Sequence, residues 1–183
     1  MGSTLTVDNI QGATTAANVK LPAGSVVQVQ KDVRYGLSSH FFNSNTTSFA
    51  ATGLEVTITP KFNNSQIMIQ CFSSMVEVTG SSADGQAGIY IKVGSGSYAA
   101  LPASGTGAAA NLASANYTVG YSHNAYAIYS PWNTYAFYTC TSLDTLKFQP
   151  YAKTNSAGTL RFGHSSSCVG IIATEITVWV LYS

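Results

Sequence analysis

The last strand-like stretch of the chain, Ile171-Ile-Ala-Thr-Glu-Ile-Thr-Val-Trp-Val-Leu-Tyr182, decides the fold class. Every second residue from Ile172 to Tyr182 is apolar or β-branched, which is the alternation typical of a strand that buries one face. The opposite face also carries Ile, Trp and Leu around a single Glu. We therefore expect a β-strand with one side in a core and an outer side that is not an ordinary solvated surface.

The same alternation recurs along the chain from Ser25 onward. It runs through 25–30, 54–59, 65–78 and 89–93, and it returns at 117–121, 135–139 and 146–149. Turn signals separate these stretches: Ala83-Asp84-Gly85 offers a positive φ at its glycine, and Asn155-Ser156-Ala157-Gly158 is a hairpin signal. No window has a helical period with caps. The pattern predicts an all-β antiparallel sandwich of the jelly-roll type.

Residues 1–24 differ from the rest of the chain. They contain too few large apolar residues for a core, and Lys20-Leu21-Pro22-Ala23-Gly24 breaks the chain before the next strand. We predict an extended N-terminal arm (1–24) that must dock on something else, followed by a knob domain (25–183). The apolar side chains available for docking are Leu5, Val7, Ile10, Val19 and Leu21.

The composition excludes several classes of partner. Charged residues make up 8% of the chain and the net charge is +1, with Lys and Arg scattered, so we expect no nucleic-acid partner. No run of about 18 apolar residues occurs, so we expect no membrane insertion. Residues 1–10 lack the basic and apolar regions of a signal peptide, and we expect a chain made in the cytoplasm.

Catalytic and metal-binding signatures are also missing. His40, His123 and His164 show no metal-ligand spacing, and no GxSxG elbow or phosphate loop is present. The three cysteines lie far apart in strand-like segments, as buried thiols of a reducing compartment do. We expect no enzyme, no cofactor and no metal site.

The surplus apolar surface suggests self-association. Tyr and Trp are enriched at protein interfaces, and we expect a homo-oligomer that buries one sheet face through Trp179, Leu181, Tyr121 and Tyr135. A compact jelly roll with one such face commonly packs around a three-fold axis, which favours a trimer. The alternative is a second core layer with ordinary exposed tyrosines.

The order of residues 5–10 (Leu-Thr-Val-Asp-Asn-Ile) and 20–29 (Lys-Leu-Pro-Ala-Gly-Ser-Val-Val-Gln-Val) resembles a known family. It looks like the segment before the C-terminal domain in tail-fibre-like proteins of bacteriophages, especially marine and cyanobacterial phages. The patterns at 52–60, 65–69, 146–153 and 172–176 are similar too. The likeness covers nearly the whole chain, and it rests on strand and turn patterns rather than on catalytic signatures.

The resemblance implies a trimeric TNF/C1q-like jelly roll on the surface of a virion, made in the bacterial host. Its arm would dock on a capsid protein or on a tail or fibre subunit. Such fibre proteins usually carry a long shaft, whereas the similar segment here starts at residue 5. We therefore expect a short fibre or knob, and a capsid decoration (cement) or head-fibre protein remains the alternative. If the knob attaches to host surface polysaccharide, its candidate contacts are Tyr98, Tyr126, Tyr129 and Trp132.

Overall fold

The structure, a computed structural model, describes residues 22–36, 42–80, 84–101, 117–121, 128–154, 158–162 and 172–182. All regular secondary structure in these ranges is β-strand. The predicted arm falls mostly outside them, and so do all five of its candidate docking side chains, namely Leu5, Val7, Ile10, Val19 and Leu21.

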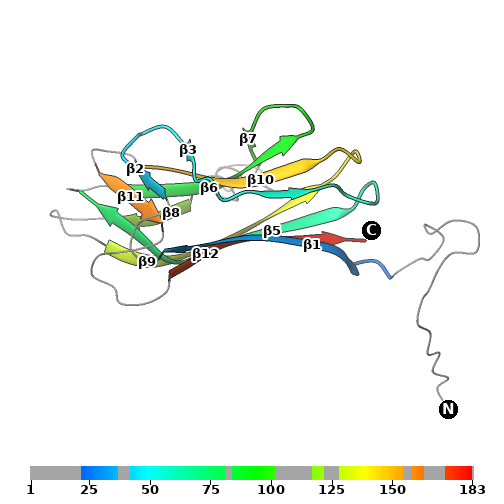
Figure 1. The fold of residues 1–183 in the computed structure, drawn as a ribbon, viewed down its shortest axis with the longest axis horizontal. Coiled ribbons are helices and arrows are strands. Elements are labelled where there is room, and N and C mark those ends of the chain that lie inside the picture. Colours follow the sequence, from blue (N-terminus) through cyan, green and yellow to red (C-terminus); the bar gives the residue numbers. More distant parts are fainter. Residues whose placement is uncertain are drawn as a thin grey trace, which may run out of the picture.

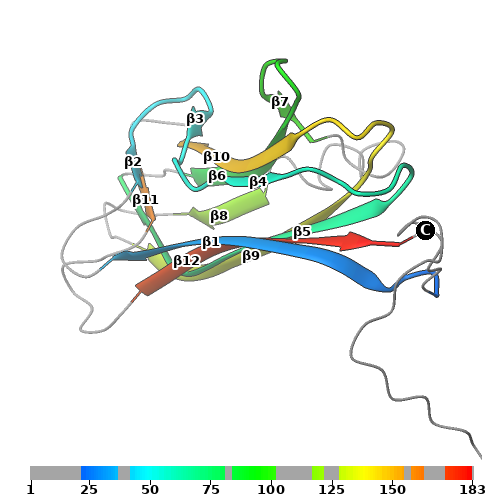
Figure 2. The ribbon, with the colours of Figure 1, turned by 45° about the vertical axis from the view of Figure 1, so that its right-hand side comes forward.

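Two antiparallel sheets lie face to face (Figures 1 and 2). The first sheet has the order β1 (Val26–Gly36), β12 (Ile172–Leu181), β5 (Gln66–Thr79) and β9 (Ile128–Thr139), with β11 (Thr159–Phe162) and β2 (Phe42–Ser44) continuing it along the second half of β5. The second sheet is centred on β10 (Leu146–Thr154) and β6 (Asp84–Val93). Its margins are β3 (Ala50–Ala51) and β4 (Val56–Ile58) beside β10, and β7 (Ala99–Ala100) and β8 (Tyr117–Tyr121) beside β6.

The strand order is that of a jelly roll. The main strands are taken in chain order as β1, β4, β5, β6, β8, β9, β10 and β12. The first sheet then contains the first, eighth, third and sixth of them, and the second sheet contains the second, seventh, fourth and fifth. Successive strands thus cross between the sheets, except for β6 and β8, which pair in the second sheet, and this is the winding of a double Greek key. The predicted all-β jelly roll is confirmed.

The core lies between the two sheets. Ile176, Val178 and Val180 of β12 are fully buried, as the alternation in the closing stretch predicted. Phe148 of β10 faces them from the second sheet's side of the core and is also fully buried. Cys71 is buried among these residues as a free thiol, and burial raises the pKa of that thiol. Two of the three predicted buried cysteines, Cys71 and Cys140, are confirmed, and Cys168 lies outside the described residues.

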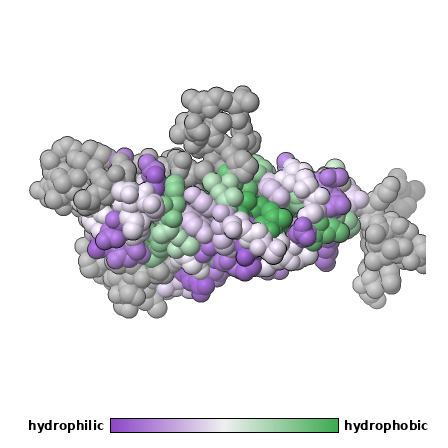
Figure 3. Space-filling model, turned by 90° about the horizontal axis from the view of Figure 1, so that it is seen from above, coloured by the Kyte–Doolittle hydropathy of each residue, from purple (hydrophilic) through white to green (hydrophobic). Residues whose placement is uncertain are grey.

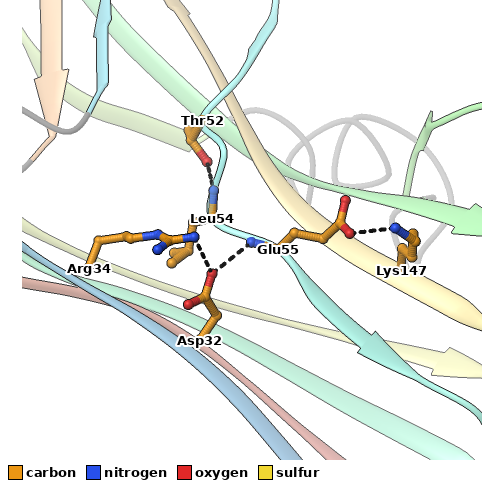
Figure 4. A network of polar contacts seen from close by, with 6 residues as sticks. All are labelled: Asp32, Arg34, Thr52, Leu54, Glu55 and Lys147. Atoms are coloured by element: carbon orange, nitrogen blue, oxygen red, sulfur yellow. Dashed lines mark hydrogen bonds and ion pairs between the residues drawn. The ribbon is translucent and has the colours of Figure 1, made fainter.

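A polar clasp joins the edge strand β1 to the opposite sheet (Figure 4). The Asp32 carboxylate accepts a hydrogen bond from the Glu55 backbone N–H at 3.2 Å and pairs with Arg34 at 3.3 Å. Gln28, on the same face of β1 as Asp32, makes similar contacts to the opposite sheet. Its amide donates to the Thr59 carbonyl at 3.0 Å and accepts from the Lys61 N–H at 3.1 Å. These bonds close the open side of the sandwich with hydrogen bonds instead of apolar packing.

Asp32→Ala should lower the free energy of unfolding by about 1–2 kcal/mol, because the Glu55 N–H loses its acceptor in a partly buried place. The matched control is Asp144→Ala, which removes an exposed carboxylate bonded within its own turn to Ser142, and it should change stability by less than about 0.5 kcal/mol. Urea unfolding at one protein concentration measures both. Equal losses in the two variants would show that the clasp contributes nothing.

Two turn predictions need correction. Gly85 lies inside β6, paired with Thr154, and the positive φ belongs to Gly80 at the end of β5. The strands that flank 155–158, β10 and β11, belong to different sheets, so this connection is a crossover and not a hairpin. A Gly-Asn-Ser cluster marks a reversal of the chain, but it does not say whether the next strand pairs with the previous one.

Candidate interaction surfaces

The outer face of the first sheet carries an apolar row that crosses four strands. The strand register places Val29 opposite Trp179, Trp179 opposite Met68, and Met68 opposite Phe137. Neighbouring residues in one register share a face of the sheet and contact one another. We call Val29, Trp179, Met68 and Phe137 the apolar row.

Much of this row is open to solvent in the single chain. Val29 is 50% exposed and Phe137 is 43% exposed, and the nearby Tyr135 ring, 62% exposed, packs edge-on against Phe137 at 6.0 Å. Polar pairs flank the row: Lys31 meets Glu175 at 3.1 Å, and Gln70 donates to Asn133 at 3.0 Å. An apolar centre with a paired polar margin is the usual composition of a protein–protein interface.

The edge strand β1 has its apolar side facing outward. Gln28, Gln30 and Asp32 lie in register with Val180, Val178 and Ile176, the core-facing residues of β12. The other side carries three apolar residues around one lysine, namely Val29, Lys31, Val33 and Tyr35, and Tyr35 is 64% exposed. This reverses the order expected of an edge strand in a monomer, which keeps polar groups toward water. The outer side of β1 therefore leaves apolar side chains exposed in the single chain.

The predicted self-association residues divide between the two sheets. Trp179, Leu181 and Tyr135 lie on the outer face of the first sheet. Tyr121 ends β8 in the second sheet, so grouping it with the other three was wrong. Sequence reasoning missed Val29, Met68 and Phe137, although each lies at an alternate position of a recognised strand. The missing information was which strands are neighbours.

A second cluster of aromatic side chains lies on the outer face of the second sheet. Tyr90 and Tyr151 stack with ring centroids 4.1 Å apart, and Phe49 and Tyr98 flank them at 5.8 and 5.7 Å. Lys153 lies over the Phe49 ring at 4.8 Å. We call Phe49, Tyr90, Tyr151 and Tyr98 the aromatic row. Figure 3 looks onto this side of the molecule, where the strongly hydrophobic colour is confined to small areas among near-neutral and hydrophilic residues.

Glu55 anchors one end of the aromatic row. Its carboxylate accepts hydrogen bonds from the Lys147 ammonium at 2.7 Å and from the Tyr98 hydroxyl. Burial alone would raise the pKa of Glu55, but these two hydrogen bonds outweigh it and lower the pKa below its ordinary value. Burial and the same carboxylate raise the pKa of Tyr98. Glu55 is therefore held ionised and Tyr98 is held protonated. The hydrogen bond between them holds the Tyr98 side chain in place on this surface.

The four predicted glycan contacts have different fates. Tyr98 lies in the aromatic row. Trp132 is in strand β9 with 1% of its surface exposed, so the expectation of a solvent-facing loop aromatic was wrong, and its ring packs against Phe162 at 5.4 Å. Tyr129 is a β9 residue whose side chain lies outside the description, and Tyr126 lies outside the described residues altogether.

Within the described ranges the chain forms no helix that is long and apolar enough to cross a bilayer. In the same part of the chain, no three His, Cys, Asp or Glu side chains gather as metal ligands would.

No protein-family model matches the chain, and none of the curated proteins matches it. Among solved structures, one similar protein is VP2 in the subviral particle of infectious bursal disease virus. The match covers 86% of this chain and 43% of the VP2 chain, at 10% sequence identity and a TM-score of 0.38. The match to the structure of the Gx strain of that virus covers 85% of this chain and 41% of the viral chain, at 11% sequence identity and a TM-score of 0.36. The match to dimeric latent PorU from Porphyromonas gingivalis covers 90% of this chain and 14% of the PorU chain, at 11% sequence identity and a TM-score of 0.28. The chain thus spans about two fifths of the viral proteins it overlaps. Overlaps of this size carry no conclusion about its function.

Proposed function

We propose that this chain is a non-enzymatic structural protein of a bacteriophage particle, a short homotrimeric knob on the virion surface. The observation that carries the self-association is the outward-facing apolar side of β1, continuous with the rest of the apolar row. A second copy of the same surface is the simplest cover for a face that is apolar in the centre and charge-balanced at its margin. The virion location follows the resemblance in sequence to phage fibre proteins.

The arm gives the knob its place on the particle. In this proposal Leu5, Val7, Ile10, Val19 and Leu21 dock on a capsid protein or on another fibre subunit, while the jelly roll projects outward. Backbone bonds from Gly24 to Tyr182 (2.7 Å) and from Tyr182 to Ser25 (2.8 Å) tie the end of the arm to the C-terminal strand. The arm therefore leaves the knob at a firmly held point.

The carboxylates support a structural role. Glu55 pairs with Lys147, Glu77 with Arg161 at 3.2 Å, and Glu175 with Lys31. The Glu77 and Glu175 pairs each join two strands, Glu55 ties the residue before β4 to β10, and each of the three carboxylates has a cation of its own. A glycosidase would instead need two carboxylates facing each other across a sugar bond. The pairing favours strand fixation over acid–base catalysis.

Sedimentation velocity of the full chain tests the proposal. A mass three times that of the chain's 19.2 kDa is expected over a wide concentration range. Immunogold labelling of intact particles should then place the protein on the head or at the tail, and deletion of residues 1–24 should release it without dissolving the trimer. If the chain sediments as a monomer at every concentration, the proposed homotrimer is wrong. If intact particles are not labelled, the proposed virion role is wrong.

A further inference from the structure

Two lysines face each other on the outer side of the second sheet. Lys92 of β6 and Lys147 of β10 are directly opposite in register. Such pairs have Cβ atoms about 4.5–5.5 Å apart, and like charges placed there oppose folding. Glu55 pairs with Lys147 at 2.7 Å, whereas Lys92 forms no ion pair or hydrogen bond with any residue that the structure describes. Among the described residues, one positive charge of this pair is therefore left without compensation.

The aromatic row lies beside the lysine pair. The next outward-facing pair along the same two strands is Tyr90 and Gln149, and Tyr98 reaches across this face to Glu55. The Tyr90 and Tyr151 rings stack, so each has one face covered, and a ligand meets their ring edges and phenol groups. Gln149 is buried beneath this surface, so its amide is not offered to a ligand. Aromatic carbon next to neutral donors and acceptors suits a sugar better than a bare anion.

The balance of charge on this face is positive. Lys92, Lys147 and Lys153 point to its outer side, so three of the chain's eight Lys and Arg are gathered on one sheet face. Glu55 and Asp84 are the carboxylates on the same side. Three cations spread along two short strands are too few for a nucleic-acid surface, which needs a basic stripe. They do suit a polymer that carries one carboxylate per sugar.

We propose that this face binds an acidic polysaccharide, with a uronate carboxylate between the Lys92 and Lys147 ammonium groups and the sugar ring against Tyr90 and Tyr98. The inference rests on the proposed function in one respect: a trimer closed by the first sheet leaves the second sheet pointing away from the other subunits. The ligand would neutralise the unpaired lysine and replace the repulsion with two charge-assisted hydrogen bonds.

Calorimetric titration of the full chain with tetragalacturonate in low-salt buffer tests this. Binding is expected, and Lys92→Gln should weaken it about tenfold or more, since a charge-assisted contact is lost. The matched control is Lys61→Gln, which removes an exposed lysine side chain on the turn between β4 and β5 and should change affinity less than about twofold. Lys92→Gln also removes the like-charge pair, so its thermal midpoint should stay level or rise, which separates lost binding from lost fold.

Two further ligands complete the titration. Neutral maltotetraose should bind far more weakly, and inorganic phosphate at the same concentration should not displace tetragalacturonate. The proposal is overturned if tetragalacturonate does not bind at millimolar concentration, if Lys92→Gln leaves its affinity unchanged, or if maltotetraose binds as well. Displacement by phosphate would show that the site binds simple anions and would overturn the proposal of a saccharide ligand. A trimer that fails to bind overturns this inference alone, whereas a monomer that binds overturns only the trimeric knob.

Discussion

Phe137→Glu should convert the assembled protein into single subunits. Phe137 is 43% exposed in the single chain, so a carboxylate there is solvated in the monomer and the fold is not disturbed. In the proposed assembly the same side chain would be covered at the β9 end of the apolar row, where a carboxylate loses water without gaining a partner. Symmetry repeats the change in every subunit. The dissociation constant should rise by at least about 100-fold, measured by sedimentation velocity over a concentration series.

Val93→Glu is the matched control for that result. Val93 is 38% exposed and lies at the end of β6, in the other sheet. It therefore receives the same charge on a similarly exposed apolar residue that the interface does not use. We expect it to sediment like the unchanged protein. Dissociation of both variants would point to a general effect of charge. If neither variant dissociates, the apolar row is not the contact surface.

Trp132→Ala should lower the free energy of unfolding by about 3–5 kcal/mol, a large share of the 5–15 kcal/mol typical of a domain. The Trp132 indole is 1% exposed and packs edge-on against Phe162, which in turn packs on Phe42 at 5.7 Å. Removing it leaves a cavity next to two large rings, which cannot collapse without moving β11. Thermal unfolding followed by near-ultraviolet circular dichroism, at one protein concentration, measures the loss.

Trp132→Phe is the sharper comparison. The Trp132 indole N–H is buried and finds no hydrogen-bond partner among the described residues, so phenylalanine removes an unsatisfied donor while keeping most of the ring contact. The expected loss is roughly 1 kcal/mol. A Phe variant as unstable as the Ala variant would mean that the N–H does have a partner. An Ala variant of normal stability would mean that Trp132 is not a core residue.

The local alternation of apolar residues was enough to predict the class of fold. Ile176, Val178 and Val180 were placed on one face by their spacing alone, and all three are buried. Side chains in a strand point alternately to its two faces, so this prediction needs only the chain itself. The outer face of the same strand was recognised as unusual in the same way, because Trp179 and Leu181 stand where polar residues are expected.

The identity of strand neighbours could not be predicted in that way. Tyr121 and Tyr135 look alike in sequence, yet one lies in β8 of the second sheet and the other in β9 of the first. Trp132 stands in a Ser-Pro-Trp-Asn stretch that has turn composition, and the register of β9 on β5 nevertheless places it in the core. Pairing between distant segments is chosen by how the whole core packs, and this overrides local preference.

The closing stretch, residues 171–182, shows where the division lies. Its own residues determined that it is a strand, which of its faces is buried, and that its outer face is too apolar for water. Only the tertiary structure placed Trp179 between Val29 and Met68 and completed the apolar row with Phe137. Likewise, only pairing of β6 with β10 set Lys92 against Lys147. The physical reason is the same in both cases: a face is a property of one strand, whereas a surface is a property of the register that joins several.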